Sequence, residues 1–195
     1  LLIGVDDCKV VNYSMGLSAT YRFGLYKQNQ EYTEDFVKSK KSLTEDLEYY
    51  TKEGKDFVIV QAAGNENNPD WKFKYDDKDK IYVRDDKNGE SPNGSLAEWD
   101  YLSSIEVPEI RDRIIVVGSL SKDGYVSGSS NRGSRVDVIA PGESIWSLSL
   151  DNGYKEDSGT SFSAPHVSGL AAILYSLNDE LEGAQVKKII LETAY

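Results

Sequence analysis

Three residue types are almost missing from this 195-residue chain, which contains one cysteine, one methionine and one histidine. The single cysteine, Cys8, excludes a disulfide bond within the chain. The single histidine, His166, limits nucleophilic catalysis, because a serine needs an adjacent base and that base is usually an imidazole.

Long apolar runs and a surplus of basic residues are also missing. No run approaches the ~20 residues that a membrane-spanning helix needs. The chain carries 22 Lys and Arg against 33 Asp and Glu, a net charge of −11, which argues against nucleic acid as a partner. It begins with Leu1 and shows no signal peptide, so we expect a piece of a longer protein, whose compartment the missing signal does not reveal.

The most informative stretch that is present runs from Ser158 to Leu177 and reads SGTSFSAPHVSGLAAILYSL. Its apolar run leaves almost no polar face, which predicts a helix buried on all sides. Pro165 is tolerated only near a helix start, so Ser161 is expected at the N-terminus, beside unpaired N–H groups and the positive end of the helix dipole. Such donors can stabilise an oxyanion, although a lone serine in this position is more often an N-cap.

The rest of the chain predicts an α/β fold with a mostly parallel sheet. Four apolar segments are expected to form strands: Cys8–Met15, Phe57–Gln61, Ile114–Gly118 and Val136–Ala140. Two further segments are expected to form helices, Ser42–Gly54 and Ala184–Thr193. The first of these helices has a capping box at Ser42 and a glycine stop at its end.

Two polar segments are expected to form β-hairpins, KFKYDDKDKIYVRDD and the residues around Asp151-Asn152-Gly153. The acidic residues of the first suit a solvated face or, through Asp76, Asp77 and Asp79, a structural calcium ion, although their spacing is not that of an EF-hand. The loop from Ser127 to Ser134 lacks the Gly-Lys-Ser/Thr ending of a P-loop, which argues against a nucleotide-binding α/β domain.

Three segments, in the same chain order, resemble one enzyme family. The string from Gly159 to Val167, Gly-Thr-Ser-x-x-x-Pro-His-Val, resembles the nucleophile motif of the subtilisin-like serine peptidases, the subtilases. Val10–Gly16 (VVNYSMG) is similar to the subtilase strand that ends in Ser-Leu-Gly, and Val58–Glu66 (VIVQAAGNE) to the strand before the oxyanion-hole asparagine. The resemblance covers nearly the whole chain, with residues 17–41 and 67–112 as long insertions.

The resemblance implies a role for each matching residue. Ser161 would be the acylated nucleophile and Asn65 a donor to the oxyanion, whereas the Gly-Asn pair taken alone favours a left-handed turn residue at Asn65. A polypeptide substrate would lie between two wall segments and bind by adding a β-strand. The walls would consist of Ser14, Met15, Gly16, Ala62, Ala63 and Gly64, with Glu66 on the pocket rim, where it would favour a basic substrate side chain.

The family's catalytic acid and base have no counterpart here, since both precede the first of these strands in the subtilase order. His166 lies five residues after Ser161, about 7.5 Å along the helix and about 140° around it, so its ring cannot reach the serine hydroxyl. No aspartate stands in an Asp-Ser/Thr-Gly context after an apolar strand, where the family's acid would be. We therefore expect an upstream segment or a partner chain to supply the Asp and the His.

The resemblance thus implies that residues 1–195 are the C-terminal portion of one subtilase catalytic domain, with a subtilisin-like α/β fold and helices on both faces of the sheet. The implied function is endopeptidase cleavage of polypeptides through an acyl-enzyme, in a secreted or cell-envelope protein. The alternative is a non-catalytic, subtilase-like module that binds peptides or a partner protein. The first strand is apolar on both faces, as expected for the interior of a sheet, yet in this chain it would form an edge. We therefore expect an upstream segment, a partner chain or a second copy to cover that edge.

Overall fold

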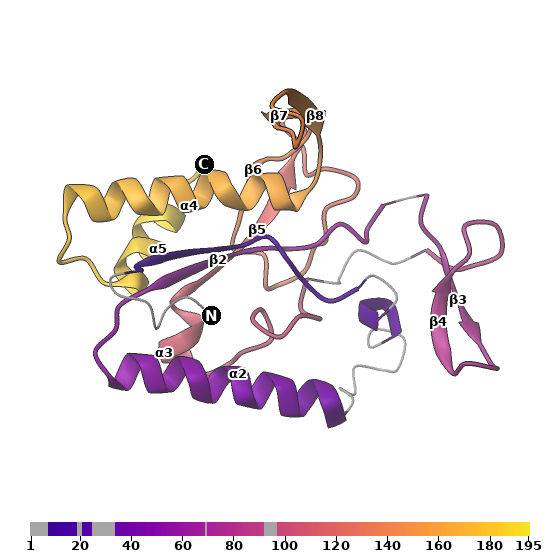
Figure 1. Cartoon of the computed structure of the whole chain (residues 1–195), viewed down its shortest axis with the longest axis horizontal. Coiled ribbons are helices and arrows are strands. Elements are labelled where there is room, and N and C mark those ends of the chain that lie inside the picture. Colours follow the sequence, from indigo (N-terminus) through magenta and orange to yellow (C-terminus); the bar gives the residue numbers. More distant parts are fainter. Residues whose placement is uncertain (1–7, 19–20, 25–33, 69, 92–96) are drawn as a thin grey trace.

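A four-stranded parallel sheet forms the centre of the molecule (Figure 1). The computed structural model describes residues 8–18, 21–24, 34–68, 70–91 and 97–195. In spatial order the strands are β1 (Val10–Tyr13), β2 (Val58–Ala62), β5 (Ile114–Leu120) and β6 (Val138–Pro141). All four predicted strands and their parallel pairing are therefore confirmed, and β1 is an edge strand.

Helices cover both faces of the sheet, as predicted (Figure 1). On one face lie α2 (Glu34–Lys52) and the short α3 (Pro108–Arg111). On the other lie α4 (Thr160–Leu177) and α5 (Gly183–Thr193). Only α3 has no counterpart among the predicted elements, because four residues are too few to show a helical period.

Alternating side chains of the central strands divide the core into two layers. In β2, Val58 and Val60 pack with the α4 and α5 layer, whereas Ile59 packs with Leu47 of α2. Every residue of β2 is buried, because an interior parallel strand is covered by helices on both sides.

Helix α2 begins at Glu34, so the predicted start at Ser42 is wrong. Ser42 lies inside the helix, and the earlier start brings Phe36 onto the buried face that Leu47 also occupies. The sequence does not reveal the helical character of residues 34–41, because Phe36 is the only buried side chain among them. The predicted end is confirmed: Gly54 adopts φ +74 just after the last turn.

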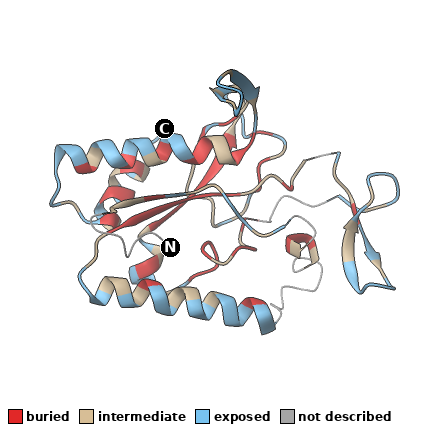
Figure 2. Cartoon of the chain, viewed as in Figure 1, coloured by how far each residue is buried: buried red, intermediate tan, exposed pale blue. Residues whose placement is uncertain are grey.

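Helix α4 is not buried on all sides, and that prediction is wrong. Its inner face, which includes Val167 and Ala171, packs on the sheet. Its outer face is open to solvent, with Leu170 42%, Ile173 55% and Leu177 78% exposed (Figure 2). We call Leu170, Ile173 and Leu177 the outer face of α4; the described part of the chain holds no element that covers it.

Both predicted hairpins are confirmed and lie outside the central sheet (Figure 1). One is β3 (Phe73–Asp76) with β4 (Ile81–Arg84), and the other is β7 (Ile145–Leu148) with β8 (Tyr154–Asp157). The ring of Phe23 stacks on Phe73 at 4.7 Å between centroids, which joins the first hairpin to a helical turn at residues 21–24.

Parts of the two long insertions, residues 19–20, 25–33, 69 and 92–96, lie outside the described residues. The assignment of residues 1–195 to one domain stays a prediction. Within the described ranges, no helix combines the length and the apolar character needed to cross a bilayer.

Candidate active site

Ser161 lies in the first turn of α4, as predicted. Gly159, which caps this helix, has φ +146, a backbone conformation that L side chains rarely adopt. A Cβ atom added at Gly159 would lie 3.2 Å from both terminal atoms of Asn65. The glycine of the Gly-Thr-Ser string is therefore required by backbone geometry and by the close approach of Asn65.

The end of β1 is hydrogen-bonded to the serine. The Ser161 hydroxyl donates to the Ser14 carbonyl (3.3 Å), and the Ser14 hydroxyl donates to the Ser161 carbonyl (3.0 Å). That carbonyl is available because Pro165, four residues later, has no N–H to donate to it. The proline thus leaves open a helix bond that the neighbouring strand segment closes, and Ser161 is held against the end of β1.

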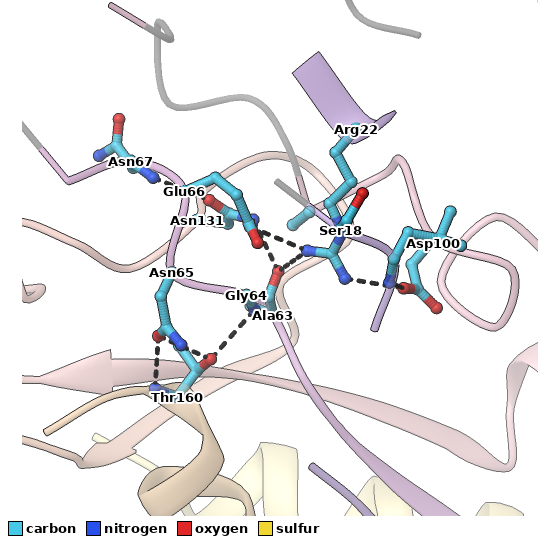
Figure 3. Close-up of polar contacts among 12 residues, drawn as sticks. Ser18, Arg22, Ala63, Gly64, Asn65, Glu66, Asn67, Asp100, Asn131 and Thr160 are labelled. Atoms are coloured by element: carbon cyan, nitrogen blue, oxygen red, sulfur yellow. Dashed lines mark hydrogen bonds and ion pairs between the residues drawn. The ribbon is translucent and has the colours of Figure 1, made fainter. Parts of the chain in front are cut away.

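Thr160, the first residue of α4, holds the side chain of Asn65 (Figure 3). The Thr160 N–H donates to Asn65 Oδ1 (2.8 Å), and the Thr160 hydroxyl donates to the same oxygen (3.1 Å). The Gly64 N–H in turn donates to the Thr160 hydroxyl (3.0 Å). Because a backbone N–H can only donate, the amide oxygen must face Thr160, and Nδ2 remains as the donor of the pair.

This orientation suits a donor to an oxyanion. The alternative of a left-handed turn residue is not seen at Asn65, because Gly64 takes the positive φ (+100) of this turn. Sequence reasoning assigned no role to Thr160, which is fully buried and connects the end of β2 to the start of α4. Its position within the Gly-Thr-Ser string was the available signal.

The two predicted wall segments follow directly after the adjacent parallel strands β1 and β2, so they leave the sheet side by side. They differ in exposure. Met15 of the first segment is 71% exposed, whereas Ala62 and Ala63 of the second are only 4% and 2% exposed. The second segment therefore presents backbone, and not open side-chain space, to its surroundings.

Glu66 is buried, which contradicts its predicted place on the pocket rim. Its carboxylate accepts hydrogen bonds from Arg22 Nη1 (3.2 Å) and from Asn131 Nδ2 (Figure 3). Both partners come from segments that sequence alone did not place near Glu66. The side chain turns inward because a buried guanidinium compensates its charge, so no free carboxylate is left for a basic substrate group.

Asn131 and Arg22 hold the turn that carries Asn65. Asn131 Nδ2 and Arg22 Nη1 donate to the Ala63 carbonyl (3.0 and 2.9 Å), and the Asn131 N–H donates to the Gly64 carbonyl (2.9 Å). The loop at residues 127–134 therefore supports the site through a buried asparagine. Neither residue carried a sequence signal, because each stands in a polar stretch typical of surface loops.

Comparison with known proteins identifies the family. The model described as the subtilase family matches residues 3–195. The chain belongs to the subtilases. Its solved neighbours agree in fold: the crystal structure of a cold adapted subtilisin-like serine proteinase superposes with a TM-score of 0.61 at 23% identity, over 98% of this chain and 50% of that one. The predicted subtilisin-like α/β fold is confirmed.

Curated subtilases match shorter segments at higher identity. Alkaline serine exoprotease A of Vibrio alginolyticus is 44% identical over 80 residues, 41% of this chain and 15% of that protein. The alkaline extracellular protease of Yarrowia lipolytica is 46% identical over 88 residues, 41% of this chain and 19% of that protein. The chain thus spans half the length of the solved neighbour, and its matches cover a fifth or less of these two relatives.

The one histidine of this subtilase chain is not hydrogen-bonded to Ser161, whose hydroxyl donates to Ser14. That histidine, His166, is exposed, and its Nδ1 donates to the Phe162 carbonyl at 2.8 Å within the same helix. The prediction that its ring serves the helix and not the serine is consistent with this bond. In the described ranges, no group of three or more His, Cys, Asp or Glu side chains is placed to hold a metal ion. A calcium ion at Asp76, Asp77 and Asp79 stays a prediction.

Proposed function

We propose that this chain supplies the nucleophile and the oxyanion-binding groups of a serine endopeptidase. The Ser161 hydroxyl would lose its proton to a histidine from outside this chain as its oxygen attacks the substrate carbonyl carbon, and Asn65 Nδ2 would donate to the oxyanion that forms. The histidine would return the proton to the amine as the peptide C–N bond breaks, which leaves an acyl-enzyme on Ser161 that water then hydrolyses. The observation that carries the proposal is the hydrogen bonding of Asn65 to Thr160, the residue before the serine.

The polypeptide substrate would lie along the segment after β1. Ser14, Met15 and Gly16 continue an edge strand, and Met15 and Gly16 are exposed, so their backbone is available to an added strand. The same segment is bonded to Ser161, which would place the reacting carbonyl of a bound peptide close to the nucleophile.

The Asp and the His of the catalytic triad would come from a segment upstream of this chain or from a partner chain. The outer face of α4 and the free edge of β1 are the surfaces against which such a segment would pack. The outer face of α4 carries apolar side chains, whose burial would stabilise the association, and the edge of β1 could pair with an added strand.

The second candidate function is a peptide-binding or partner-binding module without catalysis. It is favoured by one observation, the absence of a base for Ser161 in this sequence. An active enzyme and a binding module would share the same two wall segments and would differ in the reactivity of Ser161.

Labelling with a fluorophosphonate probe separates the two. In the full-length protein the probe should attach to Ser161, and Ser161→Ala should abolish both labelling and peptide cleavage. The matched control is Ser176→Ala, an exposed serine of the same helix, which should leave both unchanged. Labelling at another serine, or cleavage that survives Ser161→Ala, would contradict the proposal.

Secretion or location in the cell envelope is part of the proposal. It is supported by the name of the Yarrowia lipolytica relative, an extracellular protease. Detection of the full-length protein in culture medium or in an envelope fraction would test it.

A further inference from the structure

The guanidinium of Arg22 lies close to a glycine of each wall segment, and Figure 3 shows it beside Ala63 and Gly64 of the second. A Cβ atom added at Gly16 of the first wall would lie 2.2 Å from Arg22 Nη2. A Cβ atom added at Gly64 of the second wall would lie 2.0 Å from Arg22 Nη1. One planar group therefore touches both glycines, and no side chain fits at either position while Arg22 stays in place.

Buried partners hold the guanidinium there. Nη2 is paired with Asp100 Oδ2 at 2.7 Å, and Nη1 is paired with Glu66 Oε2 at 3.2 Å. Nη1 also donates to the Ala63 carbonyl at 2.9 Å. The three charged side chains are 1% (Arg22), 3% (Asp100) and 11% (Glu66) exposed. Removing one partner of such a buried set leaves an uncompensated charge, so the guanidinium does not readily leave its place.

We propose that Arg22 determines the substrate specificity of this site by filling the space between the two walls, which would otherwise take the side chain of the residue before the cleaved bond. The inference rests on the proposed peptidase function and names the substrate class: peptides with a small, uncharged residue before the cleaved bond. A bulky side chain would have to displace the guanidinium from two carboxylates. A basic side chain would meet a positive group whose carboxylate partners are already engaged.

Arg22 comes from the insertion between β1 and α2, outside the segments that carry the family motifs. It acts through space-filling and charge, and it touches the backbone of both walls. The hydrogen bonds of Thr160 to Asn65 do not involve it, and Asn131 also donates to the Ala63 and Gly64 carbonyls of the turn before Asn65. Loss of Arg22 should therefore change selectivity more than the chemical step.

The test uses the full-length protein and four peptides that differ only in the residue before the cleaved bond: Ala, Leu, Phe or Lys. The wild-type enzyme should cleave the Ala peptide with a kcat/KM about 10²-fold or more above the Phe and Lys peptides. A fluorophosphonate probe, which carries no such side chain, should label Ser161 in every folded variant.

Two variants should change the preference in different ways. Arg22→Ala leaves Glu66 and Asp100 without their positively charged partner, so it should raise kcat/KM for the Lys peptide at least 10-fold relative to that for the Ala peptide. The triple variant Arg22→Ala, Glu66→Gln, Asp100→Asn opens the same space and removes both negative charges. It should therefore raise kcat/KM for the Leu and Phe peptides but not for the Lys peptide. The matched control is Arg111→Ala with Asp137→Asn, a half-buried pair elsewhere, which should keep the wild-type order.

The outcomes are distinguishable. Absence of the Ser161 label would overturn the proposed function and this inference with it. A labelled wild-type enzyme that cleaves the Phe or Lys peptide as well as the Ala peptide would overturn this inference alone, even if both variants fail to fold. Folded variants that keep the wild-type order of preference would also overturn it.

Discussion

One hydrogen-bonding residue, Thr160, sets the orientation of the Asn65 side-chain amide. Thr160 satisfies its Oδ1 twice, so the amide is fixed in rotation and its nitrogen is the remaining donor. A donor that is already oriented before the reaction loses little free energy to reorganisation when charge develops on the substrate.

We therefore expect Asn65→Leu to lower kcat by about 10²–10³-fold in the full-length enzyme, with little change in KM; this magnitude is the one known from subtilisin, a member of the same family. Asn65→Asp is the informative second variant. It keeps the acceptor for the Thr160 N–H and removes the donor, so folding should be preserved while turnover is lost. Steady-state kinetics and thermal unfolding check both, and a wild-type kcat in either variant would refute the role of Asn65.

At the scale of elements, α4 is anchored at both ends. Its start is bonded to the end of β1, and near its end the Tyr175 hydroxyl donates to Asp56 Oδ2 at 2.7 Å. Asp56 also accepts the first N–H of α5, from Gly183, at 2.8 Å. Burial, and then the hydrogen bond and negative charge of Asp56, raise the pKa of the Tyr175 hydroxyl above its ordinary value.

Tyr175→Phe should lower the free energy of unfolding by about 1–3 kcal/mol at pH 7, because it removes a hydrogen bond to a charged acceptor. The raised pKa makes the contribution of Tyr175 complete below pH 10, where the unfolded tyrosine stays protonated, and weaker as the pH rises above 10. The difference between variant and wild type should therefore shrink between pH 9 and pH 11.

Urea unfolding of the full-length protein at several pH values measures this difference. Tyr154→Phe is the control, since Tyr154 is 72% exposed on β8. A difference that stays constant or grows above pH 10 would contradict the assignment.

At the scale of the whole molecule, the described chain leaves two adjacent elements uncovered on one side. β1 is the edge of the sheet, and α4, which packs against it, exposes its outer face (Figure 2). Exposed strand edges and apolar faces favour pairing with another chain.

Residues 1–195 expressed alone should hydrolyse no peptide, because Ser161 has no base, and should self-associate through these surfaces. Peptide hydrolysis assays and sedimentation velocity check both parts. Leu170→Lys with Ile173→Lys should shift the sedimenting species toward monomer, because both side chains lie on the outer face of α4. Hydrolysis that Ser161→Ala removes would contradict the first part, and a cooperatively unfolding wild-type monomer would contradict the second.

The strands of the central sheet and the position of Ser161 could be predicted from sequence because they depend on local pattern. Continuous apolar runs such as Val58–Ala62 indicate interior parallel strands, and a proline early in a helix places the serine at its first turn. The start of α2 could not be predicted, because Phe36 is the only buried residue in its first two turns.

By itself the sequence determined the fold class and the place of Ser161 in the first turn of α4, since each depends on contiguous segments whose pattern is visible. Tertiary structure alone decided what the polar residues do. Arg22, Glu66, Asp100 and Asn131 are scattered along the chain in stretches that look like surface loops, yet they meet in one buried network. The physical reason is that a buried charge is stable only beside its partners, and pairings between distant segments leave no periodic trace in the sequence.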